Sequence, residues 1–402
     1  MRTEPYQELR NITRNETSED MFGLPAWIYD NGEFLELEKE QIFARAWQIV
    51  CHVSDIPKPG DYRNFSLLGE DVFVMRGADE VIRGFYNVCR HRAARLLDGE
   101  TGNCPGRIVC PYHSWAYESS GELVWVPFED EYEGLERAAH GLATVECEIH
   151  LGFVFIRLES GGKSLAATLA PLTEELSLYH PEQLQPLNEL NTNEVAVNWK
   201  NGTDNYVDAL HVRLAHPGLN SLLNKTYTLE YLGEGVHRLY GRVEQITGKS
   251  EDASRYNEVL PDVPHLPETH KRKWVYYMVW PNFAFNIYPD QVEFMQFLPV
   301  APARTQIRFG TYALHDERET MAEAREINIR LNNQVGMEDT DLITRVQAGM
   351  ASRSFVRGPL GKNEICLRAF AKRMREMLPV SRELHAPSPG TVAARNVELG
   401  GR

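Results

Sequence analysis

Two short segments of this chain each place a cysteine and a histidine directly after a β-like run of residues. The first segment reads Cys89-x-His91, and the second reads Cys110-x-x-His113. Eighteen residues lie between His91 and Cys110, which is enough for a hairpin-like excursion that returns the second loop to the first. Two thiols and two imidazoles can then converge on one metal centre. The fold must therefore bring these two loops together.

Two kinds of metal centre accept such a ligand set. One is a zinc ion, and the other is a mixed-ligand [2Fe-2S] cluster, in which cysteines hold one iron and histidines the other. The spacing Cys-x-His is tight for zinc, whose ligands usually lie about two to four residues apart, whereas a cluster can take both side chains of one loop on different irons. We therefore favour the cluster. A zinc-stapled binding protein without a redox role is the alternative.

A second group of candidate ligands lies in segment 198–217, which reads as one helix ended by Pro217. Asp208 and His211 are three residues apart and share a helix face, but His216 lies about 140° around an ideal helix from His211. A π-like turn or an unwound end before Pro217 would bring both histidines to one ion. Two histidines with one carboxylate are the ligands of non-haem Fe(II) centres that activate dioxygen. Histidines that bind no metal are the alternative.

The first motif resembles the C-x-H and C-x-x-H signature of the Rieske proteins, with a slightly longer interval between its halves. The residues around both loops, up to Trp115, are similar to the oxygenase branch, the Rieske non-haem iron oxygenases or aromatic-ring-hydroxylating dioxygenase alpha subunits. This resemblance implies that Cys89, His91, Cys110 and His113 bind one [2Fe-2S] cluster per subunit.

The second motif resembles the D-x-x-H-x-x-x-x-H element of the same oxygenases, position for position. The resemblance implies that His211 and His216 bind one Fe(II) per subunit. It also implies that Asp208 bridges an iron-ligating histidine to His113 of a neighbouring subunit, so that electrons cross between chains. Asn205 matches an asparagine with a supporting role near the iron.

The third iron ligand in this family is an aspartate in a later helical region. Segment 336–349 is similar to that region, and we choose Asp339 as the ligand, with Glu338 and Asp341 as rivals. An acidic start of a helix, favoured by the helix dipole, is the alternative for all three residues.

The pattern of apolar residues predicts an α+β fold, with a small all-β domain followed by a domain that has an antiparallel β-sheet flanked by helices. The resemblance implies that the first is a Rieske [2Fe-2S] domain and the second the catalytic domain. We expect an N-terminal arm on the catalytic domain (1–46), the Rieske domain (47–160), the catalytic mononuclear-iron domain (161–381) and a C-terminal tail (382–402) that is loose or forms an extended arm. Predicted strands are 61–67, 72–75, 81–88, 107–109, 123–126, 153–156, 274–280, 283–288, 292–300 and 306–313. Predicted helices are 33–46, 165–179, 319–348 and 364–377.

Composition excludes several functions. The formal net charge of −15 argues against sequence-independent binding to nucleic acid or anionic lipid, because both require clustered lysine and arginine. No apolar run approaches the length that spans a bilayer. Six cysteines at unequal spacings are too few for a disulfide scaffold, which indicates a reducing compartment. We expect a cytoplasmic protein that binds neither nucleic acid nor membrane.

The resemblance implies the terminal oxygenase component of a multicomponent system, a mono- or dioxygenase that uses O2 to oxidise a small organic substrate. The chain lacks a G-x-G-x-x-G fingerprint and a plant-type cluster motif, so a separate flavin- or ferredoxin-type reductase must supply electrons. A bridge between chains implies a closed ring, which we expect to be a homotrimer.

The substrate is the least constrained feature. Our main expectation is hydroxylation of an aromatic, carboxylated compound, as in aromatic compound catabolism. The alternative is monooxygenation or N-demethylation of a methylated amine or quaternary ammonium compound, for which an aromatic cage would be suitable. Five aromatic residues of the second sheet could line a pocket or simply form sheet core: Phe283, Phe285, Tyr288, Phe294 and Phe297.

Overall fold

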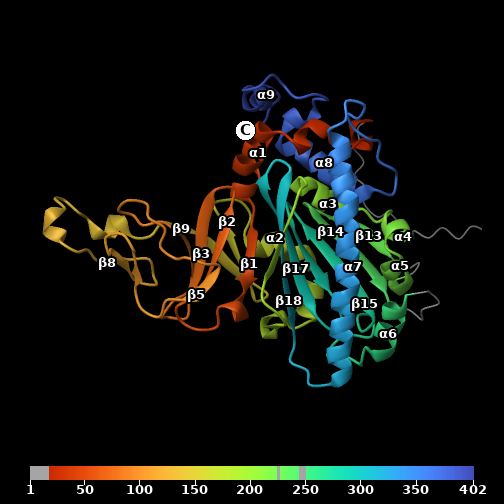
Figure 1. The fold of residues 1–402 in the computed structure, drawn as a ribbon, viewed down its shortest axis with the longest axis horizontal. Helices are drawn as coiled ribbons and strands as arrows, with labels where there is room; N and C mark the ends of the chain where they lie inside the picture. The colour runs from red at the N-terminus through yellow and green to blue at the C-terminus, as the bar shows by residue number, and fades with distance from the viewer. Residues whose placement is uncertain (1–17, 224–226, 244–249) are drawn as a thin grey trace, which may run out of the picture. The chain divides into compact units, whose positions relative to one another are not determined.

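The computed structural model describes residues 18–223, 227–243 and 250–402, and they form two compact units (Figure 1). Ala44–Ala167 make up one unit, and the described residues on both sides of this range make up the other. The segment that precedes the first unit therefore belongs with the C-terminal part of the chain. The assignment of a Rieske domain to residues 47–160 and of a catalytic domain to residues 161–381 stays a prediction.

The unit Ala44–Ala167 is built from β-strands. Seven strands form an antiparallel sheet in the order β1-β10-β9-β4-β3-β2-β5, and β6-β7-β8 form a small second sheet. Side chains alternate between core and surface along β2, where Arg63, Phe65 and Leu67 are buried, as expected for a strand with one face on a core. The strands are β1 Gln48–His52, β2 Asp61–Leu67, β3 Glu70–Arg76, β4 Ile82–Tyr86, β5 Thr101–Asn103, β6 Ile108–Val109, β7 Ala116–Tyr117, β8 Leu123–Trp125, β9 Thr144–His150 and β10 Phe153–Arg157. All six predicted strands of this unit are present.

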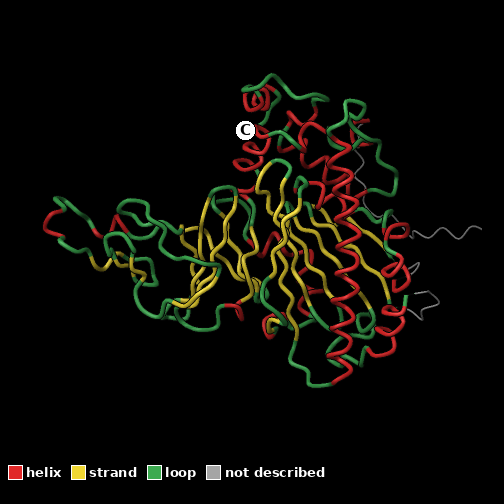
Figure 2. Tube along the Cα trace, in the orientation of Figure 1, coloured by secondary structure: helices red, strands yellow, loops and turns green. Residues whose placement is uncertain are grey.

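The other unit contains an eight-stranded antiparallel sheet in the order β11-β18-β17-β16-β15-β14-β13, with β12 also paired to β18. Figure 2 shows its long strands in yellow, with the long helix α7 in red along one face. The strands are β11 Gln185–Pro186, β12 Asn191–Val195, β13 Thr228–Gly233, β14 Val236–Arg242, β15 Lys273–Val279, β16 Phe283–Ile287, β17 Val292–Ala301 and β18 Arg304–Ala313. The prediction of an antiparallel sheet is confirmed for β15–β18, whereas β11–β14 were not predicted.

Helices complete this unit. They are α1 Gly32–Gln41, α2 Leu165–Ser177, which begins in the first unit, α3 Trp199–Val207, α4 Val212–Ala215, α5 Pro217–Leu223, α6 Glu251–Val259, α7 Glu319–Met350, α8 Ile365–Met377 and α9 Val392–Glu398. Helix α7 packs on the sheet because Ala324, Ile327 and Leu331 share one apolar core with Trp274 and Tyr276 of β15. Among the described helices, none combines the length and the hydropathy that a membrane span requires.

The prediction of a loose C-terminal tail is wrong. Residues 392–398 form α9, and the side chain of Val392 is buried. The carboxylate of Glu33 on α1 accepts hydrogen bonds from the backbone N–H groups of Gly390 (2.7 Å) and Val392 (3.2 Å). The composition of this segment suggested disorder because it reports only local preference, while these contacts with a segment far away in the sequence stabilise one conformation.

Candidate active site and cluster site

The two Cys-His loops of the first unit have the same backbone geometry. The N–H of Cys89 donates to the carbonyl of Ala94 (2.8 Å), and the N–H of Ala93 donates to the carbonyl of Cys89 (3.0 Å). The second loop repeats both bonds: the N–H of Cys110 donates to Trp115 (2.8 Å), and the N–H of Ser114 to Cys110 (3.0 Å).

A left-handed residue closes each loop, Ala93 with φ 57° and Ser114 with φ 58°. Non-glycine residues adopt this conformation rarely, and it is frequent at functional sites. Both loops are therefore shaped to present a cysteine and a histidine in matching positions.

The four side chains of these loops converge. Cys89 and Cys110 are 3% and 2% exposed, and the rings of His91 and His113 have centroids 4.6 Å apart. Trp115 stacks on His91 at 4.8 Å with nearly parallel planes. Such packing excludes solvent from the thiols and fixes the orientation of one imidazole.

Polar groups around the thiols fit a cluster. The hydroxyl of Tyr117 accepts the N–H of Arg90 (3.1 Å) and lies 3.3 Å from Sγ of Cys89, so it can donate its own proton to a thiolate at this position. Nδ1 of His91 is buried and has no hydrogen-bond partner in the described part of the chain. A buried nitrogen without a partner is costly unless it binds a metal, so this residue set fits the implied [2Fe-2S] cluster.

Segment 198–217 is not one helix, so that prediction is wrong. Helix α3 ends at Val207, Asp208 is extended, and the chain resumes as α4. His216 leaves helical geometry at φ −116° and ψ 79°, and Pro217 begins α5 instead of ending a helix. The reason is that proline forces the preceding residue out of the α region but is well suited to the first turn of a helix.

These breaks bring both histidines to one carboxylate. Nε2 of His216 lies 3.0 Å from Oδ1 of Asp339, and Nε2 of His211 lies 3.4 Å from the same oxygen. Ligand atoms of the three residues all lie within 4.8 Å of one another, and they form the one set of this kind found in the described part of the chain.

In each histidine, Nδ1, the ring nitrogen that points away from Asp339, contacts a further carboxylate of its own. Nδ1 of His211 lies 3.2 Å from Oδ2 of Asp208, and Nδ1 of His216 lies 2.7 Å from Oε2 of Glu338. If Nδ1 carries the proton in these contacts, each Nε2 is left with its lone pair directed towards Asp339. This arrangement of a carboxylate behind a ligating histidine is general in metalloproteins.

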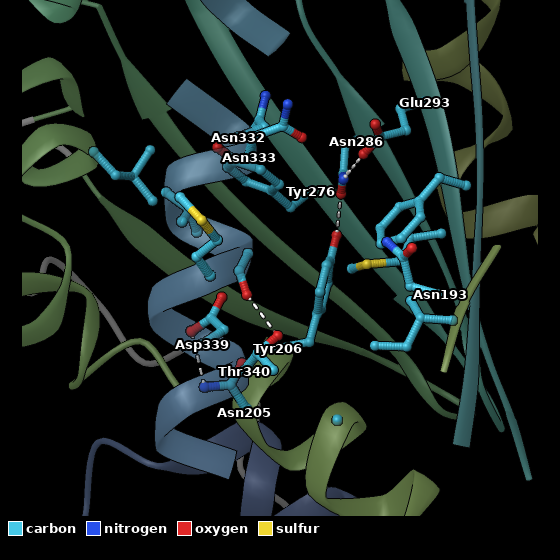
Figure 3. A pocket seen from close by; sticks show the side chains of 18 of the residues that line it. Asn193, Asn205, Tyr206, Tyr276, Asn286, Glu293, Asn332, Asn333, Asp339 and Thr340 are labelled. Atoms are coloured by element: carbon cyan, nitrogen blue, oxygen red, sulfur yellow. Dashed lines mark hydrogen bonds between the residues drawn. The ribbon is translucent and has the colours of Figure 1, made fainter. Parts of the chain in front are cut away.

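The rivals of Asp339 have other positions. Glu338 contacts Nδ1 of His216, and the exposed carboxylate of Asp341 pairs with Arg345 one turn further along α7 at 2.8 Å. Asp339 lies well inside α7, so the reading of an acidic helix start is wrong for this residue. The amide of Asn205 on α3 donates to Oδ1 of Asp339 at 3.0 Å (Figure 3).

The electrostatics of these side chains favour a cation. Burial would lower the pKa of His211, but the nearby carboxylates of Asp208 and Asp339 outweigh it and raise the pKa to about 9. Burial would also raise the pKa of Asp339, but the two histidines lower it to about 2. The carboxylates thus attract positive charge to the point where the three ligand atoms meet. The residues present fit the implied mononuclear Fe(II).

A cavity of about 740 Å³ borders the candidate iron ligands. Helices α3 and α7 form one wall, and one face of the sheet forms the other (Figure 3). On β17 the alternate residues Glu293, Met295 and Phe297 line it, because side chains of a strand alternate between its two faces.

Of the five aromatic residues considered for this pocket, Phe297 lines it. Phe283, Phe285 and Phe294 are at most 1% exposed and belong to the sheet core, and Tyr288 borders a smaller cavity of about 190 Å³. Sequence reasoning missed the polar residues of the cavity, such as Tyr206 and Glu293. A charged residue within an otherwise apolar strand was the available signal for Glu293.

An all-β unit with paired Cys-His loops and a sheet unit with a two-histidine, one-carboxylate site define a Rieske-type non-haem iron oxygenase. Residues 46–146 match the Rieske [2Fe-2S] domain family, and residues 176–380 match the family of the ring hydroxylating alpha subunit (catalytic domain). The chain belongs to this family of Rieske oxygenases: it is an oxidoreductase whose cofactors are a [2Fe-2S] cluster and a mononuclear iron. The alternative of a zinc-stapled protein without a redox role is wrong.

Relatives of known activity cover most of the chain. The carnitine monooxygenase oxygenase subunit of Acinetobacter pittii is 28% identical over 82% of this chain and 86% of its own length. The 2-aminobenzenesulfonate 2,3-dioxygenase subunit alpha of an Alcaligenes species is 27% identical over 74% of this chain and 77% of its own. A solved quaternary ammonium Rieske monooxygenase, described for carnitine oxidation by gut microbiota and inter-subunit electron transfer, superimposes with a TM-score of 0.77 at 25% identity, over 89% of this chain and 96% of that one.

Proposed function

We propose that this terminal oxygenase subunit oxidises a methylated, positively charged nitrogen compound. The observation that carries the proposal is the character of the cavity beside His211, His216 and Asp339. Three tyrosine rings line it, and no lysine or arginine is among the described residues that border it. This combination favours a cation over an anion, because aromatic faces attract positive charge and no permanently charged basic group is present among the described lining residues.

The tyrosines are Tyr206 of α3, Tyr276 of β15, and Tyr227, which directly precedes β13. The rings of Tyr227 and Tyr276 have centroids 6.3 Å apart at an angle of 63°, so they form two walls of one corner. A cation over an aromatic face gains about 0.5 to 2 kcal/mol, and quaternary ammonium groups are bound in this way. The alternative from the sequence is thus better supported than the main expectation of an aromatic acid.

A carboxylated or sulfonated aromatic substrate would find a less favourable environment in this cavity. Its anion would lose hydration on entering the cavity, and no lysine or arginine is among the described residues that border it to compensate that loss. The relative from Acinetobacter pittii and the solved structure are both described as acting on carnitine, which carries a quaternary ammonium group. Such a group is compatible with the tyrosine-lined cavity of this chain.

Each set of residues has a role in the proposed reaction. Cys89, Cys110, His91 and His113 would hold the cluster, which supplies electrons one at a time, and His211, His216 and Asp339 would hold the iron, which supplies dioxygen activation. Asp208 and Glu338 fix the two imidazoles, and the cavity walls exclude water from the substrate. Asp208 would also contact His113 of a neighbouring subunit in a homotrimer, and a separate reductase would deliver the electrons.

The overall reaction balances with that reductase as electron donor. One atom of O2 enters a C–H bond next to the charged nitrogen, and the other leaves as water with two electrons and two protons. The resulting carbinol then breaks its C–N bond, which releases a carbonyl compound, an amine and a proton.

The test is a substrate panel with a surrogate NADH-dependent flavin and iron-sulfur reductase. Quaternary ammonium compounds, N-methyl amines and aromatic acids are compared by coupled oxygen uptake and by detection of aldehyde and amine products. We expect turnover of ammonium compounds. Formation of a dihydrodiol or phenol from an aromatic acid, without ammonium oxidation, would refute the proposal.

A further inference from the structure

A polar row crosses the sheet face that borders the cavity. Tyr276, Asn286, Glu293 and Thr311 lie on β15, β16, β17 and β18, and each is paired with the next across neighbouring strands. Directly paired residues share one face of a sheet, so the four side chains point to the same side. All four line the cavity. Figure 3 shows Glu293 at one end of the drawn pocket and Asp339 towards the other.

The carboxylate of Glu293 has only neutral partners among the described residues. It accepts a hydrogen bond from the amide of Asn286 (2.6 Å) and one from the hydroxyl of Thr311 (3.3 Å). The hydroxyl of Tyr206 in turn donates to the amide oxygen of Asn286 (2.6 Å). These bonds fix the carboxylate in place, but they do not compensate its charge.

An ionised group in such a place requires a counter-charge. Burial raises the pKa of Glu293 to about 7, although Asn286 and Thr311 oppose the shift. Arg308 of β18 does not face Glu293. It donates to Gln296 at 2.7 Å, and this directly paired couple lies on the other face of the sheet. A cation that enters the cavity would supply the positive charge that stabilises the ionised form.

We propose that Glu293 is the counter-ion of the substrate nitrogen, and that the preferred substrate is a quaternary ammonium cation without a carboxylate group. This inference rests on the proposed function and narrows it. A zwitterion would bring its own carboxylate into a cavity that already holds Glu293 and is bordered by no described lysine or arginine. Such a carboxylate would lose hydration without gaining a charged partner.

Neutral polar groups complete the specificity. Asparagine side chains line the cavity from β12 and α7, namely Asn191, Asn193, Asn332 and Asn333. Amides donate and accept hydrogen bonds and are well suited to a hydroxyl group of the substrate. The cavity therefore fits a trimethylammonium group linked to an alcohol better than one linked to an acid.

Three ligands distinguish the effect of the ligand's charge on binding from the effect of its shape. Choline carries the cation and a hydroxyl, 3,3-dimethylbutan-1-ol is its uncharged carbon counterpart, and carnitine adds a carboxylate. Dissociation constants are measured by calorimetry on the fully loaded enzyme, which does not require turnover. We expect the wild type to bind choline at least tenfold more tightly than the other two probes.

The variant Glu293→Gln keeps the shape and removes the charge. We expect it to weaken choline binding by roughly 30-fold or more while binding of the neutral alcohol stays within about twofold. Glu194→Gln is the matched control, because Glu194 is a half-exposed residue of β12 in the same sheet, paired with Arg304 at 3.4 Å. It should bind all three probes like the wild type. Iron content and the visible spectrum of the cluster verify that Glu293→Gln is folded and loaded.

The pH dependence gives an independent readout. Choline affinity of the wild type should rise as pH increases through about 7 and the carboxyl group ionises, and Glu293→Gln should lose this dependence. The other titratable groups near Glu293 are Tyr206, Tyr276 and Tyr288, and burial raises their pKa well above the ordinary value, so they stay neutral in this range.

Two results would overturn the inference. One is tighter binding of carnitine than of choline by the wild type, and the other is an equal loss of affinity for choline and its neutral counterpart in Glu293→Gln, which would indicate a structural role. Both leave the proposed function standing if an ammonium compound is still oxidised. Absence of any ammonium oxidation in the substrate panel would instead refute the proposed function.

Discussion

Nε2 of His216 lies 3.0 Å from Oδ1 of Asp339, yet no hydrogen bond joins the two atoms. The other ring nitrogen of His216 is 2.7 Å from the carboxylate of Glu338, to which it can donate its proton. Nε2 of His216 and Oδ1 of Asp339 then face each other with lone pairs. Such a contact is unfavourable unless a cation lies between the two atoms. The geometry of this pair is the clearest sign of a metal site in the chain.

Replacing His211 by alanine should abolish substrate oxidation while the visible spectrum of the cluster is retained. The variant loses one proposed iron ligand, but no contact of the cluster loops. Mononuclear iron is measured by metal analysis and turnover by oxygen uptake. His315→Ala is the control, because the side chain of His315 is 82% exposed and lies outside the cavity. Retained turnover in His211→Ala would contradict the iron site.

Replacing Glu338 by glutamine should weaken iron binding by roughly 10- to 100-fold, the usual effect of losing a carboxylate behind a ligating histidine. Glutamine keeps the size of the side chain and can still accept the proton on Nδ1 of His216, but without the negative charge it stabilises that proton less. Iron affinity is measured by competition with a chelator. The exposed Glu326 of the same helix provides the control Glu326→Gln, which should bind iron like the wild type.

Replacing Asp208 by asparagine should slow electron transfer from cluster to iron with both metals still bound. The carboxylate contacts Nδ1 of His211 at 3.2 Å, and its other oxygen accepts the N–H of Leu210 at 2.8 Å. Single-turnover oxidation of the reduced cluster gives the rate, and the exposed Asp341→Asn is the control. An unchanged rate would argue against the proposed bridge to a neighbouring subunit.

Replacing Tyr117 by phenylalanine should lower the reduction potential of the cluster. The hydroxyl of Tyr117 can donate its proton to Sγ of Cys89, and such a hydrogen bond stabilises the extra negative charge of the reduced state. Loss of one such hydrogen bond corresponds to roughly 20 to 60 mV. A redox titration followed by visible absorption measures the shift, and a higher potential in the variant would contradict this role.

Replacing Lys200 by methionine should destabilise the catalytic unit by about 3 to 5 kcal/mol, because it leaves a buried carboxylate unpaired. Lys200 and Glu38 are 2.7 Å apart with fully buried side chains, and Trp199 also donates to Glu38 at 3.0 Å. Thermal denaturation measures the loss. The double change Lys200→Met and Glu38→Leu should restore much of it. Arg345→Met, which breaks an exposed pair with Asp341, should have an effect below about 1 kcal/mol.

Local sequence determined the chemistry of both metal sites and most long elements. Cys89, His91, Cys110 and His113 could be recognised because a short loop must carry its own ligands, and spacing within a loop is visible in the sequence. The strands β15–β18 and the helix α7 were predicted because their apolar patterns are long and regular. These features depend on neighbours in the chain, so they need no tertiary information.

Only the tertiary structure decided which acid joins the two histidines and what the cavity contains. Only the family resemblance favoured Asp339 over Glu338 and Asp341 in the sequence. The rotation of α7 directs Asp339 to Nε2 of both histidines, Glu338 to Nδ1 of His216 and Asp341 to solvent. The charge of Glu293 within an apolar strand was visible in the sequence, but its place in the cavity depends on three strands that align it with Asn286 and Thr311. Pairing between distant strands and the direction of a helix face depend on the packing of the whole unit, which no local pattern contains.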